Sequence, residues 1–244
     1  MGGARARLVL WVAAVATFAD LVPVGIAAPP SCMGEPATVV GTALADRIEW
    51  TSGTDVISGL GGADYVQGRG GEDLVCGGPG DDHLTSGARA GSLNGGTGDD
   101  TLVAGAGTTR VMGEEGNDIV FTSGSIGGSI YGGSGRDWLS FVDRDCGRGV
   151  SVNLFEDVAS YAECEQGSSM GEWEVVGIER LEGSWVGDRL FGTAARNYLM
   201  GHEGRDSLSG REGNDILDGG RGQDGGRGGP GKDRCLSVED RLSC

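Results

Sequence analysis

Regularly spaced aspartates are the residues of this chain best suited to bind a ligand. From Gly59 to Thr85 the sequence reads GLGGADYVQ, GRGGEDLVC and GGPGDDHLT, and each nine-residue unit has aspartate at position six. Glycine stands at positions one and four of each unit, and an aliphatic residue at position eight. Carboxylate oxygens favour hard divalent cations, and calcium accepts about six to eight oxygen ligands in loose geometry.

The unit fits the nonapeptide G-G-x-G-x-D-x-U-x, in which U is a large aliphatic residue. By this pattern the stretch resembles the hemolysin-type, or repeats-in-toxin (RTX), calcium-binding family. The resemblance implies an all-β fold, a parallel β-roll or β-helix solenoid. It also implies that several Ca²⁺ ions lie between turns on one edge, with ligands two units apart.

Further units of the same plan run from Gly41 to Ser140, with one extra residue near Ile130. Their position-eight residues are Ile48, Ile57, Val66, Val75, Leu84, Leu93, Leu102, Val111, Val120, Ile130 and Leu139. Glycine permits backbone angles that other residues avoid, so each unit is expected to be a tight turn followed by a short strand. Two units then make one coil, and position eight faces a thin core between two sheets.

Stacking such coils places the aspartates above one another at the strand spacing of about 4.8 Å. Two carboxylates at that separation repel by about 1 kcal/mol in water and by several times more near a protein surface. The sequence is therefore not expected to fold well without a cation between the stacked carboxylates.

The predicted calcium ligands are the position-six residues of all the repeats. They are Asp46, Asp55, Asp64, Asp73, Asp82, Asp100, Asp118, Asp137, Asp188, Asn197, Asp206, Asp215, Asp224 and Asp233. In the first block one edge carries an unbroken file from Asp46 to Asp137. The other edge has Asp55 and Asp73 and then loses its aspartates, so we expect a one-sided calcium ladder there, although carbonyl groups alone could hold ions on the poorer edge.

The period divides the chain into segments. We expect a signal peptide over 1–28, a leader or cap over 29–40, a first β-roll block over 41–140, and an irregular insert with a strand over 141–182. A second block follows over 183–236, and 237–244 form a C-terminal cap. Gly226 and Cys235 replace the last two aliphatic residues, so the core is expected to thin there.

The amino-acid composition and net charge limit the classes of molecule that this chain is expected to bind. The chain has 244 residues, of which 50 are glycine, and its net charge is −17. Such acidity argues against nucleic acid and anionic membranes as partners and favours cations. Apart from the first residues, no segment is long and apolar enough to span a membrane.

The N-terminus has the pattern of an export signal. Arg5 and Arg7 precede an apolar run from Leu8 to Phe18, and small residues follow. Cleavage after Ala19, Ala27 or Ala28 fits this pattern, and a membrane anchor is the alternative. We expect a secreted, extracellular protein.

The 6 cysteines fit an exported, oxidised protein. Six cysteines allow 15 pairings. Proximity in the sequence favours Cys32 with Cys76, Cys146 with Cys164, and Cys235 with Cys244.

No catalytic residue and no organic cofactor are predicted. Gly167 to Gly171 fits G-x-S-x-G without the strand-to-helix context that this motif requires, and the 2 histidines, His83 and His202, lie at variable repeat positions. The sequence thus predicts a secreted protein that binds calcium and folds on binding it. One alternative is an extracellular adhesin or surface-matrix spacer, for which contact with a cell surface or polysaccharide is open. A hydrolase with its site in the insert is the less favoured alternative.

Overall fold

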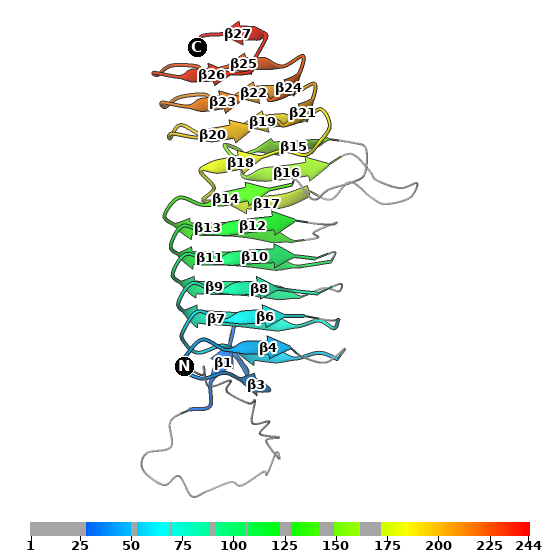
Figure 1. Ribbon diagram of the computed structural model, residues 1–244, viewed down its shortest axis with the longest axis vertical. Coiled ribbons are helices and arrows are strands. Elements are labelled where there is room, and N and C mark those ends of the chain that lie inside the picture. Colours follow the sequence, from blue (N-terminus) through cyan, green and yellow to red (C-terminus); the bar gives the residue numbers. More distant parts are fainter. Residues whose placement is uncertain are drawn as a thin grey trace, which may run out of the picture.

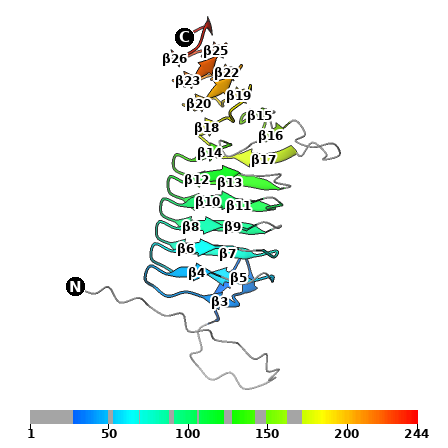
Figure 2. The ribbon, with the colours of Figure 1, turned by 45° about the vertical axis from the view of Figure 1, so that its right-hand side comes forward.

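The computed structural model describes residues 28–49, 53–68, 70–87, 91–105, 107–122, 128–141, 149–161 and 172–244. In these residues every regular element is a β-strand, and the coils stack along the long axis from the N-terminal to the C-terminal end (Figure 1). Turning the molecule by 45° shows two layers of strands joined by turns on both sides (Figure 2). The prediction of an all-β parallel β-solenoid is confirmed.

One layer is a ten-stranded sheet, as far as the described residues define it. In chain order its strands are β4 (Arg47–Glu49), β6 (Tyr65–Gln67), β8 (His83–Thr85), β10 (Thr101–Ala104), β12 (Ile119–Thr122), β14 (Trp138–Ser140), β18 (Arg180–Glu182), β20 (Tyr198–Met200), β23 (Ile216–Asp218) and β26 (Arg234–Leu236). Each strand pairs in parallel with the next, and partners within a repeat block are 18 residues apart or, at the inserted residue, 19.

The other layer is a thirteen-stranded sheet over the same described ranges. Its strands are β3 (Val39–Val40), β5 (Val56–Ser58), β7 (Leu74–Pro79), β9 (Ser92–Thr97), β11 (Arg110–Glu115), β13 (Ser129–Ser134), β15 (Val150–Asn153), β16 (Val158–Tyr161), β17 (Glu172–Val176), β19 (Arg189–Phe191), β22 (Ser207–Ser209), β25 (Gly225–Arg227) and β27 (Asp240–Leu242). Two small sheets pair β1 (Ser31–Cys32) with β2 (Glu35–Pro36), and β21 (Glu203–Gly204) with β24 (Arg221–Gly222).

The core is a single file of side chains from each sheet. Every position-eight residue of the first block, from Ile48 to Leu139, has a relative exposure of 0%. The same holds for Leu190, Leu199 and Leu217 in the second block. Strand residues alternate between the two faces of a sheet, so position eight points inward while positions seven and nine point out. The expected core is therefore confirmed.

Most of the tight turns have glycine at position four. Gly98, for example, has φ +124°, and a Cβ on it would lie less than 3.0 Å from the carbonyl oxygen of Gly80, one coil below. The left-handed backbone and the close approach of stacked turns each exclude a side chain here. This spacing of turns brings the position-six side chains of successive coils together.

The range 141–182 is expected to be irregular, but its described residues include strands of both sheets. β17 pairs in parallel with β13, and β18 with β14, so residues 172–182 continue both sheets. β16 is antiparallel to β15 and β17, which inserts one reversed strand into the thirteen-stranded sheet. Trp173, at 2% exposure, and Phe141, at 1%, fill the core at this level, with ring centroids 5.8 Å apart.

The ends of the stack are closed by covalent and apolar contacts. Disulfides join Cys32 to Cys76 and Cys235 to Cys244, as predicted, whereas Cys146 and Cys164 lie outside the described residues. Where Gly226 leaves the core without a side chain, Val238 occupies the space. The expected signal peptide also falls almost wholly outside the described residues. In the part that is described, no helix of a length and apolarity suited to crossing a membrane occurs.

The outer face of the ten-stranded sheet carries a continuous file of position-seven side chains. In register from β4 to β26 they are Arg47, Tyr65, His83, Thr101, Ile119, Trp138, Arg180, Tyr198, Ile216 and Arg234. None is acidic, although the chain as a whole is strongly acidic, and none is fully buried.

Candidate metal centre

Position-six residues form two columns, one at the turns that lead into each sheet. The first column precedes the ten-stranded sheet and consists of Asp46, Asp64, Asp82, Asp100, Asp118, Asp137, Glu179, Asn197, Asp215 and Asp233. The second column precedes the thirteen-stranded sheet and includes Asp55, Asp73, Asp188, Asp206, Asp224 and Glu239. The two columns thus divide all fourteen predicted ligands between the two edges of the stack.

Most carboxylates in these columns accept a hydrogen bond from the coil before them. The backbone N–H of Asp64 donates to Oδ1 of Asp82 at 2.7 Å, and that of Asp82 donates to Oδ1 of Asp100 at 2.8 Å. The same bond recurs between Asp100 and Asp118, 18 residues further on. One oxygen of each such carboxylate is therefore satisfied by protein, and the repeat geometry sets its position.

The second oxygen of most of these carboxylates has no partner. Nine Oδ2 atoms are buried without a hydrogen bond, those of Asp64, Asp82, Asp100, Asp118, Asp137, Asp206, Asp215, Asp224 and Asp233. A buried polar oxygen without a hydrogen bond costs about 1–3 kcal/mol of folding free energy, and an ionised oxygen costs more. Nine such atoms in register indicate that a ligand outside the polypeptide satisfies them.

Backbone oxygens converge on the same places. A Cβ built on Gly77 would lie less than 3.0 Å from both Asp82 Oδ2 and the carbonyl oxygen of Gly95. Gly95 and Gly113 have the same surroundings one and two coils further on. Each gap between coils thus holds one unpaired carboxylate oxygen and one carbonyl oxygen beside a glycine. Carboxylate and carbonyl oxygens are the ligands that calcium prefers, so the residues present fit this ion.

The electrostatics of the columns follow from burial and like charge. Burial, and after it the charge of the neighbouring carboxylates, raise the pKa of Asp82 and Asp100 to about 7. In the second column, burial and then the flanking Asp188 and Asp224 raise the pKa of Asp206 to about 7. Burial likewise raises the pKa of Asp137 to about 6. Without a bound cation, the columns therefore disfavour the ionised state.

Three turns satisfy their own position-six side chain. Thr42 Oγ1 donates to Asp46 Oδ2 at 2.9 Å, Ser184 Oγ donates to Asp188 Oδ1 at 2.9 Å, and Thr193 Oγ1 donates to Asn197 Oδ1 at 3.1 Å. In each case the N–H of the same hydroxyl residue also donates to the position-six side chain. These turns have Leu44, Val186 or Ala195 in place of the position-four glycine. We call them the self-capped turns.

The two columns differ along the stack. In the first block the first column is unbroken, whereas the second column has one stacked pair, in which the N–H of Asp55 donates to Asp73 Oδ1 at 2.9 Å. Beyond the interruption both columns are populated, because Asp188, Asp206 and Asp224 stack on one edge and Asp215 and Asp233 on the other. The acidic file is thus one-sided only in the first block.

Two column members were missed by the sequence reading. Glu179 Oε2 accepts the N–H of Asp137 at 2.8 Å, and Glu239 Oε2 accepts the N–H of Asp224 at 2.8 Å. Glu179 lies two residues before the buried Leu181, the same spacing as Asp and aliphatic residue in the repeats. That spacing could have identified Glu179 as a position-six residue, but the repeat pattern specifies Asp at this position and Glu does not match it.

Other chemistry has little support in the described residues. His83 stacks on Tyr65, and His202 Nε2 lies 2.6 Å from Glu182 Oε1, so both histidines have structural contacts. The G-x-S-x-G stretch lies outside the described residues. The described part of the chain holds no cluster of three or more His, Cys, Asp and Glu side chains suited to a metal ion.

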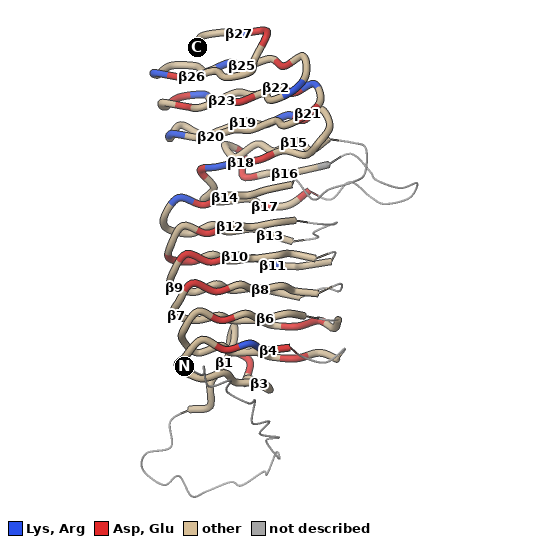
Figure 3. The backbone as a smooth tube through the Cα atoms, in the orientation of Figure 1, with Lys and Arg blue, Asp and Glu red and all other residues tan. Residues whose placement is uncertain are grey.

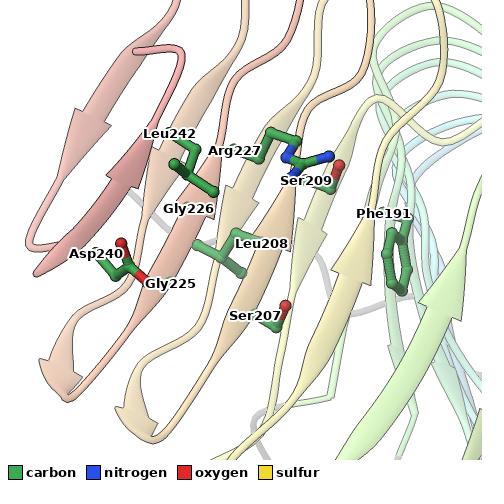
Figure 4. A pocket seen from close by; sticks show the side chains of 9 residues that line it. All are labelled: Phe191, Ser207, Leu208, Ser209, Gly225, Gly226, Arg227, Asp240 and Leu242. Carbon is green, nitrogen blue, oxygen red and sulfur yellow. The ribbon is translucent and has the colours of Figure 1, made fainter.

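A hollow of about 310 Å³ lies over β22, β25 and β27, where Gly225 and Gly226 contribute no side chains (Figure 4). Its polar lining comes from Ser207, Ser209, Arg227 and Asp240. None of its lining residues is a histidine or a cysteine. This hollow therefore offers no nucleophile paired with an imidazole base.

Comparison with known proteins agrees with this geometry. The RTX calcium-binding nonapeptide repeat, in 4 copies, matches residues 51–84, 85–124 and 187–225. No curated protein matches the chain. Among solved structures, the AlgE6R3 subunit of the mannuronan C5-epimerase from Azotobacter vinelandii is 23% identical, covering 60% of this chain and 78% of that chain, with a TM-score of 0.21. That structural likeness is too weak to support a functional argument.

Proposed function

Since this chain is built on RTX calcium-binding nonapeptide repeats, we propose that its columns hold calcium between successive coils and that it folds on binding these ions. The observation that carries the proposal is the register of nine buried, unpartnered Oδ2 atoms. Calcium, when bound, supplies positive charge between carboxylates that otherwise repel one another. The glycines beside them leave the space that a side chain would fill.

The ligand set we propose is narrower than the fourteen position-six residues. The nine residues with an unpartnered Oδ2 are proposed as primary ligands, with carbonyl oxygens of the facing glycines. Asp46, Asp188 and Asn197 belong to the self-capped turns and need no ion to satisfy them. Asp55 and Asp73 form a separate stacked pair and are proposed as one further, weaker position.

The cell compartment follows as part of the proposal. Disulfides at both ends of the stack favour an oxidising environment, which supports secretion. A chain whose fold depends on calcium would stay unfolded where calcium is scarce and fold once outside. Binding free energy then contributes directly to folding free energy.

Circular dichroism during a calcium titration tests this proposal. The purified chain in EDTA is expected to have low β content, which rises cooperatively as calcium is added. Magnesium at equal concentration is the control, because it demands near-ideal octahedral geometry and dehydrates reluctantly. Full β content in EDTA would refute calcium-coupled folding.

A role as an extracellular spacer remains the second candidate, and one observation favours it. The coils form a single elongated stack in which each coil contacts chiefly its neighbours (Figure 1). Solenoids of this kind are stiff and present long repetitive surfaces. Binding of the calcium form to intact cells would distinguish an adhesive spacer from a protein that only binds calcium.

A further inference from the structure

A groove of about 520 Å³ lies on the outer face of the ten-stranded sheet, where the two repeat blocks meet. Its floor is formed by Trp138, Arg180 and Tyr198, which are neighbours in register on β14, β18 and β20. Arg136 and Arg196 line it from the adjoining turns. Three arginines therefore line one groove on a protein of net charge −17.

The guanidinium group of Arg180 is stacked between two aromatic rings, while the N–H groups along its edge remain available to a ligand. The Arg180 guanidinium carbon lies 3.8 Å from the ring centroid of Trp138 and 4.8 Å from that of Tyr198. A guanidinium stacked in this way keeps its N–H donors in the plane between the rings, where they suit a carboxylate or phosphate. No carboxylate among the described residues forms an ion pair with it.

Buried donors in the groove lack acceptors. Nε of Arg180 and Nε1 of Trp138 are both buried without a hydrogen-bond partner. Buried N–H groups without an acceptor are unusual in folded proteins and costly. Together with the rest of the stacked guanidinium, these two N–H groups form a cluster of hydrogen-bond donors, which favours a ligand rich in oxygen atoms.

The charge of the turn side chains also changes at this level. At position five of the turns leading into the ten-stranded sheet, Asp81 and Asp99 are acidic, whereas Arg136, Arg196 and Lys232, further along the chain, are basic. Figure 3 shows acidic turns beside β8 and β10 and blue segments in the turns beside β14 and β20 on the same edge. The groove thus lies where the edge becomes basic, which attracts an anion.

We propose that this groove binds a carboxylate group of an acidic polysaccharide, a function beyond the calcium binding proposed above. The rings of Trp138 and Tyr198 and the flanking Ile119 and Ile216 offer apolar surface to the C–H faces of sugar rings, while Arg136, Arg180 and Arg196 offer donors to the carboxylate. The position-seven file continues this surface along the stack, so a linear chain can follow it.

Two other kinds of anionic chain fit less well. An extended peptide gains affinity mainly by adding a strand to an open sheet edge, but here the strands cross the groove and are already paired on both sides. A nucleic acid carries one charge per phosphate and would meet Glu179, which also lines the groove. The polysaccharide, with fewer charges and many hydroxyl groups, is the better match.

The test uses the full chain in calcium and calorimetric titration with a short hyaluronan oligomer, which bears one carboxylate per disaccharide. A chitin oligomer of equal length serves as the uncharged probe, and poly-glutamate as the acidic peptide. The variants are Arg180→Lys, which keeps the charge and loses the planar stack, and the double variant Arg136→Glu with Arg196→Glu. Arg110→Glu, at an exposed position of β11 in the other sheet, is the matched control.

We expect the hyaluronan oligomer to bind and the chitin oligomer to bind at least about tenfold more weakly, since a hydrogen bond to a charged group contributes about 1.5–3 kcal/mol. Arg180→Lys and the double variant should each weaken binding by about tenfold or more, and Arg110→Glu by less than about twofold. Circular dichroism in calcium must show that each variant is folded. The proposal is overturned if folded protein binds neither sugar, binds both equally, prefers poly-glutamate, or binds hyaluronan equally well in all variants. None of these outcomes would affect calcium-dependent folding, which is measured separately.

Discussion

Replacing Asp100 by Asn should make calcium-free protein more stable and calcium binding weaker. Asp100 is 1% exposed, and its Oδ2 has no partner, while Asp82 and Asp118 flank it in the column. The amide oxygen of Asn can still accept the N–H of Asp82, which donates to Asp100 Oδ1 at 2.8 Å. The substitution therefore removes charge while the hydrogen bond between coils is kept.

The size of the effect follows from the coil spacing. Two ionised carboxylates about 4.8 Å apart repel by about 1–3 kcal/mol at the edge of a protein. At pH 8 we expect the Asp100→Asn variant without calcium to gain stability of that order for each ionised neighbour. In calcium, it should bind one ion fewer and fold at a higher calcium concentration, because one carboxylate ligand is lost.

Two assays separate these opposite changes. Urea unfolding in EDTA, with trimethylamine N-oxide added if the chain is otherwise unfolded, reports the calcium-free stability, and calorimetry counts the ions. Asp46→Asn is the matched control, because Asn197 already makes the same contacts with Thr193 that Asp46 makes with Thr42. If Asp100→Asn leaves the ion count unchanged, or if Asp46→Asn lowers it equally, the reasoning from unpartnered oxygens is refuted.

Three further predictions concern the turns. Gly98→Ala should destabilise the calcium form by about 2 kcal/mol or more in urea unfolding, because its φ is +124°, whereas Gly61→Ala, whose Cβ would lie 3.5 Å from its nearest neighbour, should be tolerated. Thr193→Val should cost about 1 kcal/mol with or without calcium, since it removes the hydroxyl bond to Asn197; a loss confined to the calcium form would contradict this. In EDTA with trimethylamine N-oxide, the free energy of unfolding from urea titrations should fall as the pH rises from about 4 to about 7, because burial raises the folded-state pKa of Asp82 to about 7 while that of an unfolded Asp stays near 4. Stability that rises over this range would contradict the assignment.

Much of the fold was readable from the sequence, because one short plan repeats. The spacing of Ile48, Val66 and Leu84 gave the inward file, and the 18-residue coil followed from it. The disulfides at both ends were favoured by proximity alone. Each nine-residue repeat has the same turn and strand as the coils of the folded protein, so the repeat pattern alone was sufficient to predict these features.

The remaining features depend on contacts between coils, which periodicity does not specify. Glu179 enters the first column only because β18 pairs with β14, although Asp137 and Glu179 are 42 positions apart in the sequence. The self-capping of Asp188 by Ser184 requires hydrogen-bond geometry that a position-six match cannot reveal. The stacking of Arg180 between Trp138 and Tyr198 likewise joins three residues that lie far apart in the sequence.

A calorimetric count of calcium ions per chain tests the central claim most directly. With nine unpartnered carboxylate oxygens and one weaker stacked pair, the count should be nine or ten. A titration without heat and without uptake of calcium would contradict the account, and so would a count of one or two ions per folded chain.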